Sequence, residues 1–294
     1  MDGGRLEGVL KTLAWEFQSS GIKTIYCYSG DDRHDPVFYE EVPLLKAMLE
    51  ETHIDCPVLE ISDREFEPAM WDHETSLAFM PGAPSSLLHD HLVNKIDDLK
   101  KFVNDGGAII LQCGAAYWAC REVEYRLSAT QKINKIRELA LWKGKSVGPL
   151  LFCDKNQSND IEYYHDTVEI HWLGSDSLKR NYPDGLKVQT FLSGGGTLFP
   201  AAEEYPSKIL ATYSDQTRTI VKTTVGKGTA ILANPYFIHS ADYFKSGLQG
   251  FEENFPQHNW QKIIENLEPA SEKLKSQVCF VDMLLEASRG STNK

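Results

Sequence analysis

The sequence predicts an α/β fold in which helices cover both faces of a mostly parallel central sheet. Over the first half of the chain, extended apolar runs alternate with stretches of helical spacing, which is the pattern of β-α-β units. The run at 108–111 (AIIL) is apolar throughout, as expected of a strand that is buried on both faces. In the second half, shorter extended runs between glycine-containing turns predict additional antiparallel strands.

The first β-α-β unit follows an N-terminal helix. This helix spans about residues 4–18 and precedes the first strand at 22–28, which is rich in β-branched and aromatic residues. Residues 42–52 have apolar side chains at helical spacing, and residues 55–61 are extended again. Because a helix joins the two strands, we expect them to be parallel.

A second unit leads into the most apolar strand. We expect a strand at 77–80 that ends at the turn 81–86, which is rich in proline, glycine and serine. A helix at 90–104 follows. Asp105-Gly106-Gly107 ends it, because glycine commonly terminates helices, and the chain then enters the strand at 108–111.

The second half predicts a smaller set of strands and a final helical region. Gly226-Lys227-Gly228 is a hairpin-type turn and not a phosphate-binding loop, because the GxxxxGK[ST] pattern does not surround it. Residues 260–287 are expected to be helical, and 288–294 form a polar tail. We find no linker and no repeat, so we expect one domain over residues 1–294. The expected strands are 147–153, 167–173, 188–192, 208–213, 220–225 and 229–233.

Composition excludes several classes of protein. The 294 residues include 30 Lys and Arg and 42 Asp and Glu, a net charge of −12 that opposes binding to nucleic acid or an anionic membrane. Hydrophobic residues make up 41% and charged residues 24%, so the chain is neither disordered nor fibrous. We expect no signal peptide and no transmembrane span, and therefore a cytoplasmic protein. The six cysteines have no metal-binding spacing, so we expect no metal and no cofactor.

Cys113 lies where the apolar strand gives way to a predicted helix. A nucleophile elbow has this arrangement, because its strained turn exposes the side chain and small neighbours let the helix pass close to the strand. Residues 114–116 (Gly-Ala-Ala) are such neighbours. A helix N-terminus favours the thiolate. The backbone N–H groups of Gly114 and of Gly82 or Ala83 are candidate donors to an oxyanion.

The alternative is that Cys113 is a small buried hydrophobic residue, as most cysteines of cytosolic proteins are. The residues alone favour neither interpretation. Cys120, one or two helical turns further on, is expected to be a packing residue. The same is expected of Cys27, Cys56, Cys153 and Cys279.

These motifs together resemble the glutamine-amidotransferase-like domain at the N-terminus of biotin–protein ligases, within the class I glutamine amidotransferase superfamily. The resemblance covers roughly residues 22–243. It implies a flavodoxin-like fold, and it implies that Gly194, Gly195 and Gly196 lie near the pocket. The matching motifs are YCYSG at 26–30, MPGA at 80–83, QCGAAY at 112–117, GGG at 194–196, LATY at 210–213 and VGKGTAIL at 225–232.

The sequence departs from the superfamily at two places. The superfamily elbow has glycine two residues before and two residues after the cysteine, whereas this chain has Leu111 and Ala115. The catalytic histidine and glutamate of the superfamily match Tyr236 and Ile238 here. Tyrosine, with a pKa near 10, cannot replace imidazole as a general base at neutral pH. Either His239 reaches the thiol through a shift of the loop, or the triad is lost and the fold is used for binding.

Other polar residues are predicted near the same edge of the sheet. His34 follows the first strand and is a further candidate base. His89, His91, His165 and His171 are expected to be solvated or packed. The acidic residues Asp31, Asp32, Asp35, Glu40 and Glu41 are expected to be solvated, with favourable charge at a helix N-terminus.

Three functions remain open from the sequence. The first is a pocket at Cys113 that binds a small carboxylate or amide ligand, or acts weakly as an amidase or acyl-transfer site. The second is a non-catalytic regulatory or protein-interaction module on the same fold. The third is a cysteine hydrolase with His34 or His239 as base. The Gly-rich biotin-adenylate motif is absent, so we expect no biotin ligase domain. The expected partner is a small molecule or a protein, and not a nucleic acid or a membrane.

Overall fold

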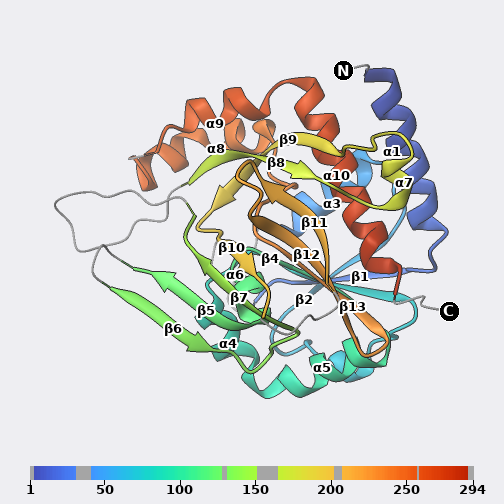
Figure 1. Cartoon of the computed structure of the whole chain (residues 1–294), viewed down its shortest axis with the longest axis vertical. Coiled ribbons are helices and arrows are strands. Elements are labelled where there is room, and N and C mark those ends of the chain that lie inside the picture. The colour runs from blue at the N-terminus through green and yellow to red at the C-terminus, as the bar shows by residue number, and fades with distance from the viewer. Residues whose placement is uncertain are drawn as a thin grey trace.

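A nine-stranded sheet forms the centre of the molecule (Figure 1). The structure is a computed structural model that describes residues 3–30, 41–127, 131–150, 165–201, 207–256 and 258–290. The strand order is β2-β1-β3-β4-β13-β12-β11-β8-β9. In chain order these strands are β1 (Thr24–Tyr28), β2 (Val58–Ile61), β3 (Ser76–Met80), β4 (Ala108–Gln112), β8 (His165–Trp172), β9 (Leu186–Ser193), β11 (Ser207–Tyr213), β12 (Arg218–Val225) and β13 (Gly228–Ala233).

The sheet joins a parallel part to an antiparallel part. Strands β2, β1, β3, β4 and β13 run parallel to one another. With β13 counted as the fifth strand, their order is the 2-1-3-4-5 order of flavodoxin-like folds. Strands β12, β11, β8 and β9 extend the sheet as antiparallel neighbours. The predicted fold class is therefore confirmed, and the carboxyl ends of the parallel strands meet at the edge where such folds bind ligands.

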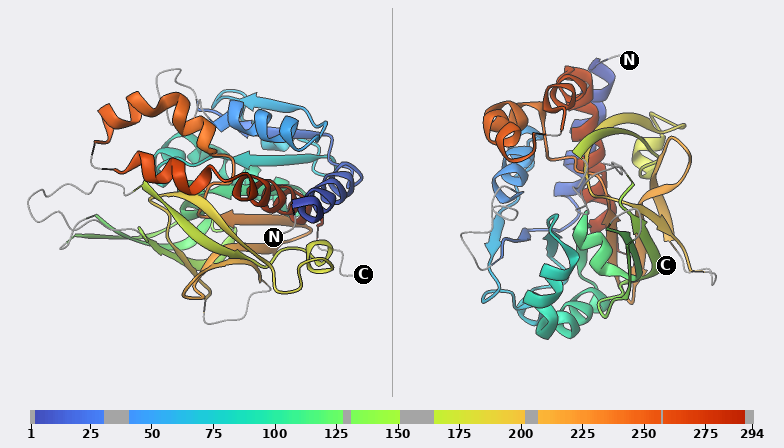
Figure 2. Two further views of the ribbon diagram at one scale, coloured as in Figure 1. Left: turned by 90° about the horizontal axis from the view of Figure 1, so that it is seen from above. Right: turned by 90° about the vertical axis from the view of Figure 1, so that its left-hand side faces the viewer.

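Helices cover both faces of this sheet, because the strands in its middle bury alternate residues on opposite sides. Leu77 and Phe79 of β3 pack with α1 (Gly3–Gln18), α3 (Glu41–Glu51) and α10 (Ala270–Ser288). Ala78 and Met80 pack with α4 (Ser85–Leu92), α5 (Ile96–Asp105) and α6 (Gly114–Ala119). Figure 2 shows α1 and α10, from opposite ends of the chain, side by side on one face.

The helix expected at 90–104 is interrupted. The structure has α4, a 3₁₀ turn η2 (Val93–Lys95) and α5, so helix begins at Ser85 and is broken before Ile96. Leu92 lies before this break and Ile96 after it, and both are buried. The apolar face of the segment therefore continues through the break. The expected C-terminus is confirmed: Gly106 has a φ of +136°, and its N–H donates to carbonyls of the last turn.

A second sheet covers part of the α4–α6 face. Its order is β10-β7-β5-β6, with β5 (Cys120–Arg126), β6 (Lys132–Ile136), β7 (Trp142–Gly148) and β10 (Thr197–Phe199). The expectation of a helix through Cys120 is wrong, because α6 ends at Ala119 and β5 begins at Cys120. The strand expected at 147–153 starts five residues earlier, and its last three residues, including Cys153, lie outside the described part.

Further short elements complete the described chain. They are η1 (Pro68–Met70), α7 (Asp176–Lys179), α8 (Ala241–Asn254) and α9 (Trp260–Leu267). The sequence analysis did not predict α8, whereas it did predict helices over the segment of α9 and α10. Among the described residues, no helix is both long and apolar enough to cross a membrane.

Candidate functional site

Cys113 forms the turn between β4 and α6 at the carboxyl edge of the sheet. Its φ is +49° and its ψ is −112°, a conformation that residues with a side chain rarely adopt. Such a backbone costs about 1–3 kcal/mol unless neighbouring contacts impose it. Two contacts hold it here: the Cys113 N–H donates to the Ala233 carbonyl at 2.7 Å, and the Cys113 carbonyl accepts from the Tyr117 N–H at 3.3 Å.

The sulfur of Cys113 is enclosed by polar groups. The thiol donates to the Ser193 carbonyl at 3.0 Å, and the Tyr236 hydroxyl and the Gly114 N–H bond to the sulfur. Cys113 is only 8% exposed. Burial raises the pKa of the thiol to about 11, against the opposing effect of the Tyr236 and Gly114 hydrogen bonds, and the charge of Glu41 raises it further. The thiol is therefore protonated at neutral pH.

The loop after β3 lies directly against this turn, since β3 and β4 are parallel neighbours. A Cβ atom at Gly114 would lie 1.5 Å from the Ala83 carbonyl oxygen. A Cβ atom at Gly82 would lie 1.9 Å from the hydroxyl oxygen of Tyr236. Gly114 thus requires glycine because a backbone atom lies in the way, whereas a side chain at Gly82 would have to displace the Tyr236 ring. The segments that carry Gly82, Ala83 and Gly114 form one side of the site.

Tyr236 occupies the position next to the thiol. It follows β13, and its backbone is anchored to β9 because the Tyr236 N–H donates to the Phe191 carbonyl at 2.8 Å and its carbonyl accepts from the Thr190 hydroxyl at 2.6 Å. Burial raises the pKa of Tyr236 well above its ordinary value, and the nearby thiol and Glu41 act in the same direction. Tyr236 is therefore a neutral phenol that donates to the sulfur and cannot accept its proton.

His239 lies behind Tyr236. The two rings meet edge to face with centroids 4.7 Å apart, and within the described residues no hydrogen bond joins His239 to Cys113. The His239 Nε2 is 3.6 Å from a carboxylate oxygen of Glu41, and its Nδ1 has no hydrogen-bond partner there. Burial, with a smaller effect of His165, lowers the pKa of His239 to about 3, so its imidazole is neutral.

Glu41 is the residue that the sequence analysis misjudged. It was expected to be a solvated charge, but it is 4% exposed at the start of α3 and faces the interior. Its charge raises the pKa of Cys113, Tyr236 and Cys27, which places it close to all three. A carboxyl group beside His239 had no signal in the sequence, because an acidic residue at a helix start is ordinarily solvated. Its neighbours Asp31, Asp32, Asp35 and Glu40, and the candidate base His34, lie outside the described residues.

The glycine run 194–196 follows the residue that the Cys113 thiol contacts. Ser193, which accepts the thiol hydrogen bond, immediately precedes it. The Gly194 carbonyl accepts from the Tyr117 hydroxyl at 3.1 Å, and the Gly196 carbonyl accepts from the Tyr213 hydroxyl at 3.0 Å. The Gly195 carbonyl accepts from a backbone N–H of the chain after β7 at 2.7 Å. The run is thus a firmly held wall of the site.

An aromatic cluster encloses the site on the side of α8 and α9. Phe191, Tyr236 and His239 pack against one another, and Phe244 and Trp260 continue the cluster outward. The cluster also holds His165, whose two ring nitrogens have no partner within the described chain. Burial, with a smaller effect of His258, lowers the pKa of His165 to about 3. The cluster has no signal in the sequence, because its members come from four separate segments.

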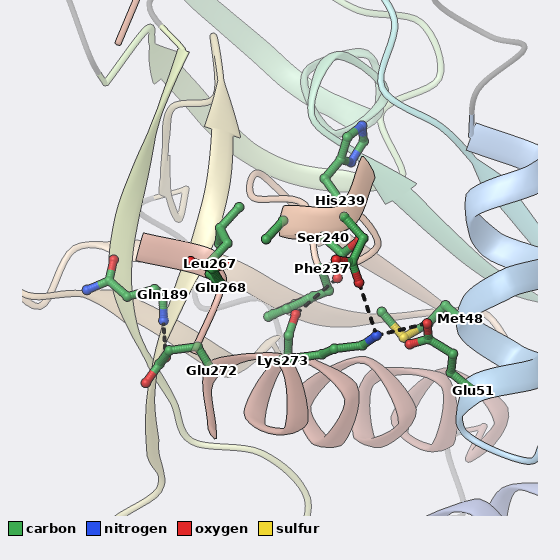
Figure 3. Close-up of a pocket in the computed structure, with 13 residues that line it drawn as sticks. Met48, Glu51, Gln189, Phe237, His239, Ser240, Leu267, Glu268, Glu272 and Lys273 are labelled. Atoms are coloured by element: carbon green, nitrogen blue, oxygen red, sulfur yellow. Dashed lines mark hydrogen bonds and ion pairs between the residues drawn. The ribbon is translucent and has the colours of Figure 1, made fainter. Parts of the chain in front are cut away.

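A small hollow of about 50 Å³ lies on the α10 side of this cluster (Figure 3). Lys273 lies across it, with its ammonium 3.0 Å from Glu51 and 3.6 Å from Asp242. Figure 3 shows the imidazole of His239 pointing away from Lys273. Cys113 is not among the lining residues, so this hollow is separate from the thiol. No group of three or more potential metal ligands occurs in the described part of the chain.

Comparisons with known proteins agree with this architecture. A family model described as "Biotin-protein ligase, N terminal" matches residues 23–292. A solved glutamine amidotransferase from Thermotoga maritima is 10% identical, with 90% of this chain and 98% of that chain covered and a TM-score of 0.56. A glutamine amidotransferase from Methylobacillus flagellatus is 11% identical, with 90% and 94% covered and a TM-score of 0.47. No curated protein matches. At this identity, the first structure shows a shared fold and nothing about activity.

Proposed function

The chain belongs to the biotin-protein ligase N-terminal family, and we propose that it is a ligand-binding module. In this proposal Cys113 contacts a small amide or carboxyl compound and does not catalyse its conversion. One observation carries this proposal. The phenol of Tyr236 hydrogen-bonds the sulfur of Cys113. Tyr236 stands at the position that matches the catalytic histidine of the amidotransferase superfamily.

The protonation states favour binding over catalysis. With a pKa of about 11, only about one thiol in ten thousand is ionised at pH 7. His239, whose imidazole packs against the ring of Tyr236, has a pKa of about 3. Transfer of the thiol proton to this imidazole is therefore unfavourable. A thiol that stays protonated is a hydrogen-bonding group and a poor nucleophile.

The backbone around Cys113 supports a ligand carbonyl as the group that is bound. The Gly114 N–H already faces the sulfur, and the loop with Ala83 lies in contact with Gly114. The Gly114 N–H can donate to a carbonyl oxygen, as it would in an oxyanion hole. The Ala83 group that approaches Gly114 is its carbonyl oxygen, which is an acceptor. The buried carboxyl of Glu41 acts on the same thiol, which disfavours a second negative charge there. An amide is therefore the preferred class at Cys113.

A second candidate function is weak amide hydrolysis, which the pairing of His239 with Glu41 at 3.6 Å favours. In that reaction the sulfur forms a bond to the amide carbon, the carbon–nitrogen bond breaks, and the thiol proton leaves with the amine. Water then hydrolyses the thioester. It requires Tyr236 to move aside so that His239 can reach the thiol, because Tyr236 contacts both groups.

Two measurements on the same samples test the proposal. Thermal unfolding is recorded with acetamide and with glutamine, and ammonia release is assayed in parallel, for the wild type, Cys113→Ser and Cys113→Ala. We expect an amide to raise the unfolding temperature of the wild type more than that of Cys113→Ala, with ammonia at the background level. Ammonia release that Cys113→Ser abolishes would support the second candidate. An equal shift in wild type and Cys113→Ala would contradict the proposal.

A further inference from the structure

Arg137 is a buried arginine whose guanidinium lies at the N-terminus of α4. It follows directly after β6 and is 8% exposed. Its backbone N–H donates to the Arg121 carbonyl at 2.9 Å, which fixes the start of the side chain. Its Nη2 donates to the hydroxyl of Ser85, the first residue of α4, at 2.7 Å.

In the described part of the chain, no carboxylate pairs with this guanidinium. Within the described residues Arg137 forms no ion pair, and its buried Nε has no hydrogen-bond partner. Burial lowers the pKa of Arg137, and only the exposed carboxylate of Asp90 acts in the opposite direction, from beyond ion-pair distance. Arginine is almost never buried without a partner of opposite charge, because the desolvation of an unpaired charge is unfavourable. The arrangement therefore points to a missing anion.

The start of α4 offers donors at the same place. The N-terminal flanking residue is Pro84, and no side chain caps this end of the helix. The N–H groups of Ser85, Ser86 and Leu87 have no partner within the helix, because the first turn of a helix leaves them unpaired. They also lie at the positive end of the helix dipole, which attracts anions. Guanidinium and helix N-terminus thus converge at Ser85.

We propose that Arg137 and the first turn of α4 form an anion-binding subsite that takes one carboxylate or phosphate group. The guanidinium of Arg137 and the N–H groups of Ser86 and its neighbours supply the donors. Ala83, which contacts Gly114, is two residues before Ser85, so the subsite begins within about 7 Å of the Cys113 turn. The subsite does not depend on any role for Cys113.

The competing explanation is that Arg137 has only a structural role through Ser85. Two variants separate the explanations. Arg137→Met keeps the length of the side chain and removes the charge. Ser86→Asp puts a carboxylate at an exposed position of the first turn, where it stabilises a helix but repels an incoming anion. The matched controls are Ser86→Asn, which is neutral, and Lys11→Gln, which removes an exposed positive charge from α1.

The experiment measures the binding of inorganic phosphate and of acetate by calorimetry. All variants are made in the full chain with Cys113→Ala, so that the result is independent of the thiol. We expect at least one anion to bind, with affinity about tenfold or more weaker in Arg137→Met and in Ser86→Asp. Ser86→Asn and Lys11→Gln are expected to stay within about twofold of the parent.

Each result has one meaning. Binding of acetate alone, of phosphate alone or of both supports the subsite and identifies its anion as a carboxylate, a phosphate or either. If Arg137→Met does not fold, Ser86→Asp decides, because an acidic residue at this position is expected to stabilise α4. The proposal is overturned if neither anion binds, or if Ser86→Asp binds as tightly as Ser86→Asn.

Discussion

Gly82 lies so close to Tyr236 that a Cβ atom at Gly82 would be 1.9 Å from the phenol oxygen. The loop after β3 therefore helps to hold the Tyr236 hydroxyl against the sulfur of Cys113. The proposed function depends on this contact, because Tyr236 takes the place from which a base would act on the thiol.

The first prediction concerns Gly82→Ala. The added methyl group cannot fit beside Tyr236, so the phenol must move and the thiol becomes more accessible. We expect a loss of roughly 1–3 kcal/mol in the free energy of unfolding and a severalfold faster alkylation of Cys113 by iodoacetamide, measured by peptide mass spectrometry. The control is Gly8→Ala in α1, where a Cβ meets nothing within 4 Å. Unchanged alkylation in a folded Gly82→Ala protein would contradict the close contact.

The second prediction concerns the backbone of Cys113. Glycine adopts a φ of +49° without strain, whereas alanine does not. We therefore expect Cys113→Gly to be more stable than Cys113→Ala by about 1 kcal/mol in urea unfolding. At Gly8, which is exposed in α1, the order is reversed, and alanine is expected to be more stable than glycine by up to about 1 kcal/mol. Equal stabilities at position 113 would argue against a strained turn.

The third prediction concerns the Tyr236 hydroxyl. Its hydrogen bond lowers the pKa of Cys113, so Tyr236→Phe should raise that pKa further and leave less thiolate at any given pH. Alkylation of Cys113 at pH 9 is expected to slow, although the ring remains in place. Tyr26→Phe, at a phenol that stacks on Trp71, should not change the rate. Faster alkylation in Tyr236→Phe would mean that the phenol acts mainly as a steric cover.

The fourth prediction concerns acid. The pKa values of His165 and His239 are about 3 in the folded protein and near 6.5 when unfolded. The unfolded chain thus binds more protons below pH 6.5, so stability is fully present above that pH and decreases as pH falls toward 3. Each histidine is expected to lower the free energy of unfolding by roughly 2 kcal/mol at pH 5, relative to its value above pH 6.5.

His165→Phe tests this acid effect, because phenylalanine fits the aromatic surroundings of His165 and cannot be protonated. Urea unfolding at pH 8 and pH 5 should show a smaller loss of stability in the variant than in the wild type. An identical loss in both proteins would show that His165 is not buried as a neutral group.

The fold and the position of the thiol could be predicted from the sequence because they depend on local patterns. The apolar run 108–111 followed by Cys113 and small residues marks a strand, a tight turn and a helix, and the structure has β4, Cys113 and α6 there. Matching to the superfamily also put Tyr236 at the histidine position, and the structure places Tyr236 against the sulfur.

The remaining features depend on contacts between distant segments. Glu41 is an acidic residue, and acidic residues are ordinarily solvated. Its burial beside His239 becomes visible only in the folded structure. Strand β6 (KINKI) is polar and mostly exposed, so it has no buried face to mark it. Arg137 gave no signal either, because its contact with Ser85 joins residues 52 positions apart.

The rate of alkylation of Cys113 as a function of pH tests the central claim most directly. It is measured by peptide mass spectrometry from pH 6 to pH 9 in the wild type and in His239→Gln. A neutral thiol with a pKa of about 11 predicts a rate that rises about tenfold per pH unit without a plateau, in both proteins. A plateau below pH 8 that disappears in His239→Gln would show a thiolate paired with imidazole, and would contradict the account of Cys113 as a binding group.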